Sequence, residues 1–402
     1  MQMEFTEDQE QFREVVSRFL QDKSTPIEVR KQMASDTGYD RSVWHQLCEE
    51  VGLAGTHIPE AFGGFGFGPI ELGVVAEEMG KHLYCGPFFS SSVMAGYALL
   101  CSADNSSKEK LLPGIAVGTT LAALVLDSLN SPDAIGRSLS VENNLLSGSA
   151  GLVLDAHIAD LLVVIARSET GLSLYSTPSD TEGVSIELLE TIDQTRKVSN
   201  ISFESTPVDK IGEVDNESLN QMWDHICVAL AHEMIGGAQH LLETTIDYTK
   251  MRYQFGRPIG SFQGLKHRCA DLLMEVEIAK AATHHAARCL DSGEGEPYAA
   301  SMAKALAADS YMKAAREAIQ LRGGIGFTWE EDTQLWFKRA KSSEVLMGTP
   351  TLHRERMISI MEEPSANREP SADKEPSANR EPSADKELSA NKEPSASQEH
   401  IS

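Results

Sequence analysis

The sequence predicts an α+β protein in which an all-α segment, a β segment and a second helical segment follow one another, with a disordered tail at the end. Three observations support this fold class. Apolar residues recur at helical spacing before residue 118 and again over residues 213–362. Residues 119–212 instead hold short apolar runs separated by turn residues. Residues 363–402 repeat in near-identical hexads with almost no apolar side chain.

The first segment, residues 1–118, is predicted to be an N-terminal α-helical domain. Further helical patterns occupy residues 40–51 and 69–79, separated by short Gly and Pro breaks. The opening pattern, over residues 1–22, is amphipathic, and its apolar face is formed by Phe5, Phe12, Val15, Val16 and Phe19.

The second segment, residues 119–212, is predicted to be a middle β-domain, either a small barrel or a sandwich. Its apolar runs are too short for helices and are bounded by turn residues. We expect strands at residues 122–126, 151–153, 161–165, 172–175 and 198–203.

The third segment, residues 213–362, is predicted to be a C-terminal four-helix bundle, because long helical patterns return with little Pro or Gly between residues 223 and 252. After it, hexads such as EPSANR and EPSADK cannot bury enough surface to offset their ordering entropy. We therefore expect residues 363–402 to be disordered. The tail is then a solvated extension or, alternatively, a tether that binds a partner.

Composition limits the function classes. A net charge of −25 argues against nucleic-acid binding, which needs a concentrated basic surface. The six cysteines show no CxxC pair, and the histidines show no HExxH pairing, so we predict a reduced protein without a metal site. No apolar run is long enough to span a membrane, and no signal peptide opens the chain. We expect a cytoplasmic protein.

Several motifs resemble those of the acyl-CoA dehydrogenase family. Residues 320–327 read QLRGGIGF, and a Gly-Thr pair at 348–349 and a His-Arg pair follow at family spacing. Residues 248–263 match the family pattern YxxxRxxFGRPIGSFQ. Near the start, residues 58–60 (IPE) and 77–80 (EExG) match its N-terminal helical domain. The resemblance covers residues 4 to 358. Within it, the sequence of residues 326–354 is most similar to the bacterial branch that desaturates steroid side chains.

This resemblance implies an oxidoreductase that introduces an α,β double bond into an acyl-CoA thioester. Such an enzyme needs a base for the α-proton and FAD for the β-hydride. In the family, FAD lies in a groove of one subunit's β-domain, and the partner subunit's C-terminal domain covers its adenine and pyrophosphate. The resemblance also implies a tetramer and an electron-transfer flavoprotein, or a similar acceptor, as redox partner.

The motif match also implies which residues of this chain are its covering residues, meaning those that contact the adenosine and pyrophosphate of FAD. Arg252 matches the arginine that pairs with the FAD pyrophosphate, a role that suits its planar, permanently charged guanidinium. The remaining positions match the adenosine contacts, the turn beneath the adenine and the Gly-Thr pair, and they are Phe255, Phe262, Gln263, Gln320, Gly323, Gly324 and Thr349.

Other family residues are absent. Met347 stands at the position of the catalytic glutamate, and Ile226 stands at the alternative position that some members use. The T-x-P-x-x-G-S-D segment that touches the flavin is replaced by residues 124–133, which lack the Gly-Ser-Asp. Thr351 stands where relatives often place Gln or Glu. The substitute bases available nearby are, in order of preference, Asp224, Glu344 and Glu243.

These departures leave three hypotheses. The first is a subunit of an α2β2 heterotetramer, in which this chain completes the FAD site and a second acyl-CoA dehydrogenase chain supplies the base. The second is a self-sufficient homotetramer with a relocated carboxylate such as Asp224. The third is a non-catalytic interaction protein that uses the tail as its contact arm.

Overall fold

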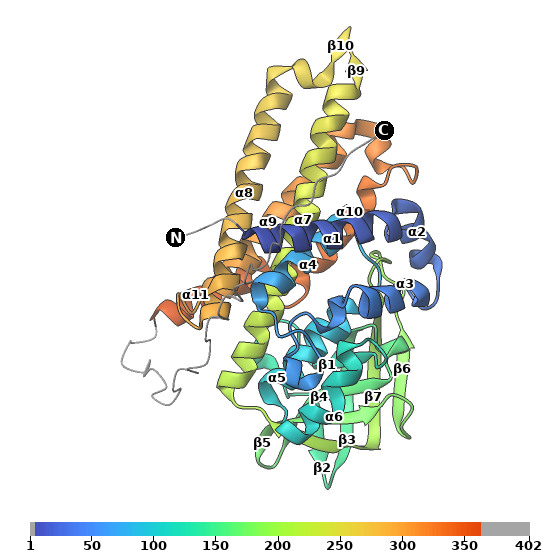
Figure 1. Cartoon of the computed structure of the whole chain (residues 1–402), viewed down its shortest axis with the longest axis vertical. Coiled ribbons are helices and arrows are strands. Elements are labelled where there is room, and N and C mark those ends of the chain that lie inside the picture. Colours follow the sequence, from blue (N-terminus) through green and yellow to red (C-terminus); the bar gives the residue numbers. More distant parts are fainter. Residues whose placement is uncertain (1–4, 363–402) are drawn as a thin grey trace, which may run out of the picture. The chain divides into compact units, whose positions relative to one another are not determined.

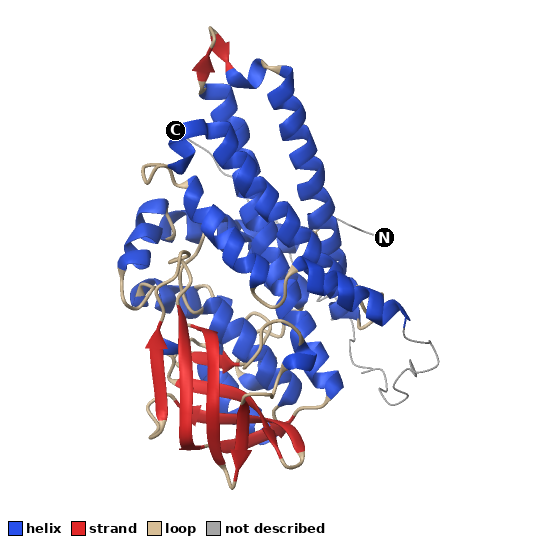
Figure 2. Ribbon diagram, turned by 180° about the vertical axis from the view of Figure 1, so that it is seen from behind, coloured by secondary structure: helices blue, strands red, loops and turns tan. Residues whose placement is uncertain are grey.

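The computed structural model describes residues 5–362, and it confirms the predicted order of helices, β-sheet and helices (Figures 1 and 2). The predicted disorder of residues 363–402 lies outside the described residues. The division into domains at 118/119 and 212/213 stays a prediction. No helix within residues 5–362 is long and apolar enough to cross a membrane.

The N-terminal part is helical, as predicted. Its elements are α1 (Glu7–Lys23), α2 (Pro26–Ala34), α3 (Arg41–His45), the π-helix η1 (Gln46–Glu50), the 3-10 turns η2 (Leu53–Gly55) and η3 (Glu60–Phe62), α4 (Pro69–Lys81), the π-helix η4 (Phe88–Ala95), α5 (Gly96–Ser102) and α6 (Asn105–Ala116).

Helix α1 begins with a capping box, in which Thr6 and Gln9 bond each other's backbone N–H. Val16 and Leu20 form its buried face. The prediction was wrong for Val15, whose side chain is 53% exposed. At 100° per residue, consecutive positions cannot share one narrow stripe, so burial of Val16 turns its neighbour outward.

The middle part holds a single eight-stranded sheet within the described residues, with the strand order β6-β7-β3-β2-β4-β5-β8 and β1 paired to β4. Its strands are β1 (Ala122–Val125), β2 (Leu139–Glu142), β3 (Leu145–Leu154), β4 (Leu161–Ser168), β5 (Gly171–Pro178), β6 (Val184–Leu188), β7 (Val198–Pro207) and β8 (Asp209–Glu213). The five expected strands are present, and β2, β6 and β8 were not expected.

The two faces of β1 and β4 belong to different cores. Leu124 and Val163 join the large core that continues into the helices, and α5 and α6 lie over this region in Figure 1. Val125 and Val164 join a second core whose buried members come from strands and the turns between them. A core enclosed by one sheet requires the sheet to fold over on itself, as expected for a small barrel or sandwich.

The C-terminal part is the predicted helical bundle. Its long helices α7, α8 and α9 pack on one another, and α10 packs on α7 and α9. The elements are α7 (Asn216–Met251), the short strands β9 (Tyr253–Gln254) and β10 (Arg257–Pro258), the 3-10 turn η7 (Ile259–Ser261), α8 (Gln263–Ser292), α9 (Ala299–Arg322), the 3-10 turn η8 (Gly323–Phe327), α10 (Thr333–Val345) and α11 (Pro350–Glu362).

Helices α4 and α7 cross at a backbone-to-backbone contact made by two glycines. A Cβ on Gly80 would lie 1.9 Å from the carbonyl oxygen of Glu233, and a Cβ on Gly236 would lie 1.9 Å from that of Glu77. No side chain fits at either position, so the glycine of the EExG motif is needed to let the two helices pack closely. The crossing fixes the N-terminal helices against the bundle and places Glu233 in the interior.

Candidate active site

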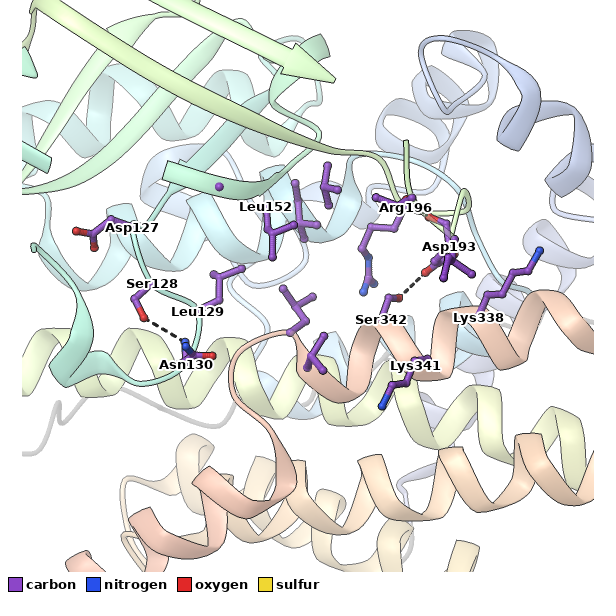
Figure 3. Close-up of a pocket in the computed structure, with 17 residues that line it drawn as sticks. Asp127, Ser128, Leu129, Asn130, Leu152, Asp193, Arg196, Lys338, Lys341 and Ser342 are labelled. Carbon is purple, nitrogen blue, oxygen red and sulfur yellow. Dashed lines mark hydrogen bonds between the residues drawn. The ribbon is translucent and has the colours of Figure 1, made fainter. Parts of the chain in front are cut away.

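A cavity of about 740 Å³ lies between the β-sheet and α10 (Figure 3). Its walls are the loop after β1 (residues 127–130), part of β3, the loop before β7 (residues 191–196) and the last turns of α10. The lining is mostly apolar, and its cationic side chains are Arg196, Lys338 and Lys341. A volume of several hundred Å³ with a few placed polar groups is typical of sites for cofactors and other small molecules.

The loop after β1 is held by Asp127 and not by a Gly-Ser-Asp turn. One Asp127 oxygen accepts from the backbone N–H of Gly136 at 2.8 Å, and the other accepts from those of Arg137 and Ser138 at 2.6 and 2.5 Å. Asp127 therefore lines the cavity with its carboxylate already occupied by backbone donors. Ser128 accepts only from the N–H of Asn130, at 3.4 Å.

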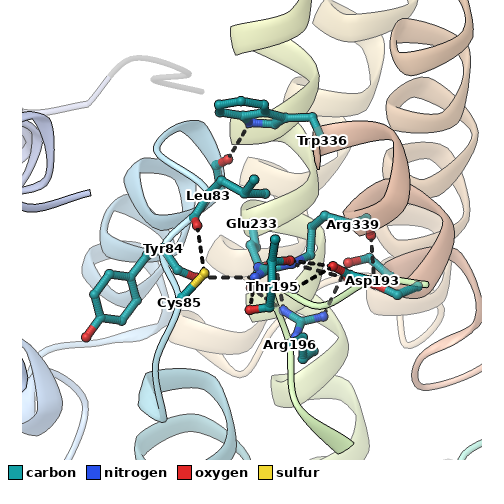
Figure 4. Close-up of polar contacts among 12 residues, drawn as sticks. Leu83, Tyr84, Cys85, Asp193, Thr195, Arg196, Glu233, Trp336 and Arg339 are labelled. Atoms are coloured by element: carbon teal, nitrogen blue, oxygen red, sulfur yellow. Dashed lines mark hydrogen bonds and ion pairs between the residues drawn. The ribbon is translucent and has the colours of Figure 1, made fainter. Parts of the chain in front are cut away.

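Beside the cavity lies a buried cluster of charges, here called the Glu233 network and formed by Asp193, Arg196, Glu233 and Arg339 (Figure 4). Arg196 donates to both oxygens of Glu233 at 2.7 Å. Arg339 donates to Glu233 at 2.9 Å and lies 3.6 Å from Asp193. These residues join the loop before β7, the middle of α7 and α10, so the network fastens the β-sheet to the bundle.

The network also shapes the cavity wall, because Asp193, Arg196 and Ser342 line the cavity and Ser342 donates to Asp193. Burial acts to raise the pKa of Glu233, but Arg196 and Arg339 together hold this pKa below its usual range. Glu233 therefore stays ionised and paired. It is an anchor for two arginines and is not free to act as a base.

The two positions of the family's base converge in the apolar interior. Met347 and Ile226 are both fully buried. The carbonyl of Met347 lies 3.9 Å from the thiol of Cys227, the neighbour of Ile226. Met347 also has a φ of +57°, an uncommon conformation for a residue with a side chain. Neither side chain can accept a proton, as expected from the sequence.

A buried lysine and a buried histidine hold the Met347 turn in place. Lys304, on α9, donates to the carbonyls of Ser343 and Gly348 at 3.1 Å each, and burial lowers its pKa to about 8. The Nε2–H of His353 donates to the carbonyl of Met347 at 2.8 Å. Burial lowers the pKa of His353 to about 3, so this ring is neutral at pH 7.

The three substitute carboxylates lie in different surroundings. Asp224 accepts from Arg356 at 2.5 Å, and burial raises its pKa while Arg356 opposes that shift. It is not among the residues that line the cavity. Glu344 accepts from Lys341 at 2.5 Å near the end of α10, and Glu243 is exposed and accepts from Gln239. Thr351 is exposed in the first turn of α11.

The predicted covering residues gather at the far end of the bundle, near β9 and β10 (Figure 1). Tyr248 donates to the carbonyl of Arg322 at 3.4 Å, which joins the end of α7 to the end of α9. The covering residues of these two segments are exposed or half-buried, and they are Arg252, Phe255, Phe262, Gln263, Gln320, Gly323 and Gly324. Thr349, by contrast, lies beside the Met347 turn, where its hydroxyl accepts from the N–H of Leu352.

This end of the bundle is rich in exposed rings. Phe255 and Phe327 are 89% and 83% exposed. The guanidinium of Arg257 lies 4.0 Å from the ring centre of Phe262. Exposed aromatic rings beside arginine are typical of surfaces that contact another molecule.

The covering residues of α7 lie far along the helix from Ile226, one of the two base positions. Arg252 is about 39 Å from Ile226 along α7, at the 1.5 Å rise per residue of an α-helix. The cavity, in turn, is lined by Leu346, directly before the Met347 turn. The covering residues at the end of α7 and the Met347 turn are therefore separate places in one chain.

Family models for the N-terminal and C-terminal domains of acyl-CoA dehydrogenases match residues 6–119 and 220–361. Acyl-CoA dehydrogenase IpdE2 of Mycobacterium tuberculosis is 35% identical over 348 residues, which cover 86% of this chain and 94% of that protein. This chain belongs to the acyl-CoA dehydrogenase family. As a member it is a FAD-dependent oxidoreductase, and the expected cofactor is confirmed.

Solved structures support the same family. The steroid acyl-CoA dehydrogenase Tcur3481-Tcur3483 is similar to this acyl-CoA dehydrogenase with a TM-score of 0.81 and 26% identity, over 90% of this chain and 99% of that one. The ChsE4-ChsE5 complex of Mycobacterium tuberculosis has the same fold, with a TM-score of 0.81 and 22% identity over 92% of this chain and 100% of that one. The likeness to this steroid acyl-CoA dehydrogenase agrees with the predicted family.

The bundle end of this acyl-CoA dehydrogenase fits part of FAD. A Cβ on Gly323 or Gly324 would meet nothing within 4 Å, so the backbone of this turn is open to a ligand. Arg252 is exposed beside it and would pair with a pyrophosphate. FAD supplies the hydride acceptor when bound, and these residues would bind its adenosine and pyrophosphate.

Sequence reasoning missed the Glu233 network and Lys304. Glu233 and Lys304 lie in runs of α7 and α9, residues 226–238 and 299–308, whose other members are apolar or small except for His232. A charge inside such a run is a signal of a paired buried group. Its partners come from segments far away in the sequence, so the pairing itself needed the fold.

Proposed function

We propose that this acyl-CoA dehydrogenase is the FAD-completing subunit of a heterotetramer that desaturates an acyl-CoA thioester. A second acyl-CoA dehydrogenase chain would supply the base and the flavin groove. The observation that carries this proposal is the separation of the covering residues near Arg252 from the closed base positions at Met347 and Ile226. This chain offers one side of a flavin site and leaves the other side to a partner.

The burial of both base positions supports the proposal. In an accessible site a nearby carboxylate of the same chain could replace the missing glutamate, whereas a buried position leaves no room for one. Met347 and Ile226 have no exposed side-chain surface and belong to the large apolar core, and Lys304 and His353 bond the backbone of the Met347 turn. A carboxylate placed there would have to be buried, which is unfavourable unless it is paired and hydrogen-bonded. The interior around the Met347 turn is therefore built for packing and not for proton transfer.

The nature of the substrate is part of the proposal. The likeness to a steroid acyl-CoA dehydrogenase favours an acyl-CoA with a steroid-type side chain, with a branched or fatty acyl group as the other candidates. We propose an electron-transfer flavoprotein or a similar acceptor as redox partner, and the cytoplasm as the site of action.

Co-expression tests the proposal. This chain would be purified alone and together with an acyl-CoA dehydrogenase chain that carries the missing glutamate and the Gly-Ser-Asp loop. Flavin content, mass in solution and turnover with an artificial electron acceptor would be measured for both samples. We expect flavin and turnover in the two-chain complex and little of either in the lone chain. Full flavin loading and turnover by the lone chain would reject the proposal.

The self-sufficient homotetramer makes a different prediction for Asp224. If Asp224 is the base, Asp224→Asn abolishes exchange of the substrate α-proton and leaves the bound flavin in place. If the base comes from the partner, exchange by the two-chain complex persists in this variant. The ion pair of Asp224 with Arg356, and its absence from the cavity lining, favour the second outcome.

The non-catalytic hypothesis is tested by flavin alone. A protein that only uses the fold for interaction would carry no flavin in any complex that it forms. Removing residues 363–402 provides the matched experiment, because loss of assembly on truncation would support the tail as a contact arm. We expect the two-chain complex formed with the truncated chain to retain its assembly and its flavin.

A further inference from the structure

Two clusters of potential metal ligands occur among the described residues, both away from the cavity. The first joins Glu77, His232 and His284, but Arg13 donates to the second oxygen of Glu77 at 2.7 Å. A metal ion there would lie beside a guanidinium that already neutralises the carboxylate. Because Glu77 is already paired with Arg13, we propose no metal ion at this cluster.

The second cluster joins His285, Cys289 and Glu296 at the end of α8. His285 Nε2 lies 2.7 Å from Glu296 Oε2 and 3.5 Å from Cys289 Sγ. Cys289 Sγ lies 4.0 Å from Glu296 Oε2. In contrast to Glu77, the carboxylate of Glu296 is paired with His285, and within residues 5–362 no lysine or arginine forms an ion pair with it.

The local fold brings these three side chains together. His285 and Cys289 are four residues apart and therefore lie on the same face of α8. Gly293 ends the helix with a φ of +69°, and Gly295, with a φ of +119°, turns the chain back. A Cβ on Gly295 would lie 2.4 Å from Cys289 Sγ, so only glycine lets Glu296 return to the helix surface.

We propose that His285, Cys289 and Glu296 bind a zinc ion, with water as the fourth ligand. A tetrahedral zinc ion, with bonds of about 2.0–2.1 Å to N and O and about 2.3 Å to S, separates its ligand atoms by about 3.3–3.6 Å. The distances of 2.7, 3.5 and 4.0 Å between the three atoms scatter around this range. Small rotamer adjustments therefore suffice to complete the site.

The chemistry of the donors favours zinc over calcium or magnesium. Thiolate and imidazole are soft or borderline ligands, whereas calcium and magnesium require oxygen ligands. Binding takes the thiolate form, so the thiol proton of Cys289 passes to the solvent. The three residues are half-buried or exposed, which leaves an entry path and room for the water. The ion would fasten the turn between α8 and α9, and none of its three ligands lines the cavity between the β-sheet and α10.

Cobalt spectroscopy on the full chain, purified without a histidine tag and stripped of metal, tests this site. Cobalt(II) should bind with a thiolate-to-cobalt charge-transfer band, and added zinc should displace it. Cys289→Ser should abolish the band and weaken zinc binding at least tenfold, since even outer-shell changes at zinc sites cost about 10–100-fold. Cys269→Ser is the matched control, because Cys269 is another partly buried thiol on α8, and it should keep the band and the affinity.

Glu296→Gln provides a second variant on the surface, where the fold is least affected. It should retain the charge-transfer band but weaken zinc binding at least tenfold. Absence of the band in the wild-type chain, or its persistence in Cys289→Ser, would overturn the proposal. So would unchanged zinc affinity in Glu296→Gln.

Discussion

Replacing Glu233 with glutamine tests the Glu233 network. Glu233 is the carboxylate that Arg196 and Arg339 share, at distances of 2.7 and 2.9 Å, and all three side chains are buried. The amide keeps the size of the side chain but removes its charge. Asp193 is then left as the nearby carboxylate, at 3.6 Å from Arg339.

The magnitude follows from the burial. Removing one partner of a buried ion pair costs about 3–5 kcal/mol, because the remaining charge stays buried without compensation. Two arginines lose their partner here, whereas the glutamine oxygen still accepts one hydrogen bond. We therefore expect the free energy of unfolding to fall by about 3–5 kcal/mol, a large part of the roughly 5–15 kcal/mol that stabilises a typical protein.

Urea denaturation followed by circular dichroism gives the free energy of unfolding. Asp247→Asn is the matched control, since Asp247 lies on the same helix and forms an exposed pair with Lys250 at 3.0 Å. Exposed pairs contribute about 0–1 kcal/mol, so the control should stay close to the wild type. A change below about 1 kcal/mol in Glu233→Gln would contradict a buried, mutually dependent network.

The same variant should change the acid dependence of stability. The pKa of Glu233 is below its usual range in the folded protein. The stability from this group is therefore present above the pKa of an unfolded glutamate and is lost as the pH falls through the folded pKa. The free energy of unfolding of Glu233→Gln should decrease less steeply below about pH 4.5 than that of the wild type.

Three further changes test other parts of the structure. The pKa of His353 is lowered to about 3, so below about pH 6.5 the unfolded chain binds a proton at this residue that the folded chain does not bind. The free energy of unfolding therefore decreases by up to about 1.4 kcal/mol for each unit by which the pH is lowered. Urea titrations at pH 7 and 5 should show a smaller decrease for His353→Gln than for the wild type. Arg252→Ala should lower the flavin retained by the two-chain complex, measured by absorbance, whereas the exposed neighbour Lys250→Ala should not; equal losses would contradict a pyrophosphate contact. Gly236→Ala should destabilise the chain by at least about 1–3 kcal/mol in the same urea assay, because its Cβ would lie 1.9 Å from a backbone oxygen of α4, whereas Gly264→Ala has open space and should be neutral or slightly stabilising.

Periodicity was sufficient for the order of the parts but not for every strand. The runs at β1 and β4 are mainly apolar and buried, so their composition alone indicates strands. β6 is half exposed and polar at alternate positions, and β2 has only four residues. Such strands are defined by their partners in the sheet, and the partners of β6 are known only once β7 is placed beside it.

Some residues of the candidate site could likewise be predicted from the sequence, and others could not. Arg252 and Gly323 could be placed by motif, and the structure brings their segments to one end of the bundle. Glu233 lies in a mainly apolar run that indicates a buried paired group, but its partner could not be predicted, because Arg339 is 106 positions away in the sequence. The proposed zinc site could not be predicted from the sequence because it depends on two turns of the backbone. The sequence between Cys289 and Glu296 has no metal-binding spacing until the turns at Gly293 and Gly295 fold Glu296 back.

We propose that FAD is bound between this chain and a second, different chain. Flavin absorbance per chain should be measured in the purified lone protein and in the co-purified complex. We expect bound flavin in the complex, little in the lone chain, and loss of flavin from the complex when Arg252 is changed to alanine. A lone chain that carries a full complement of flavin and reduces it with an acyl-CoA would show that no second chain is needed.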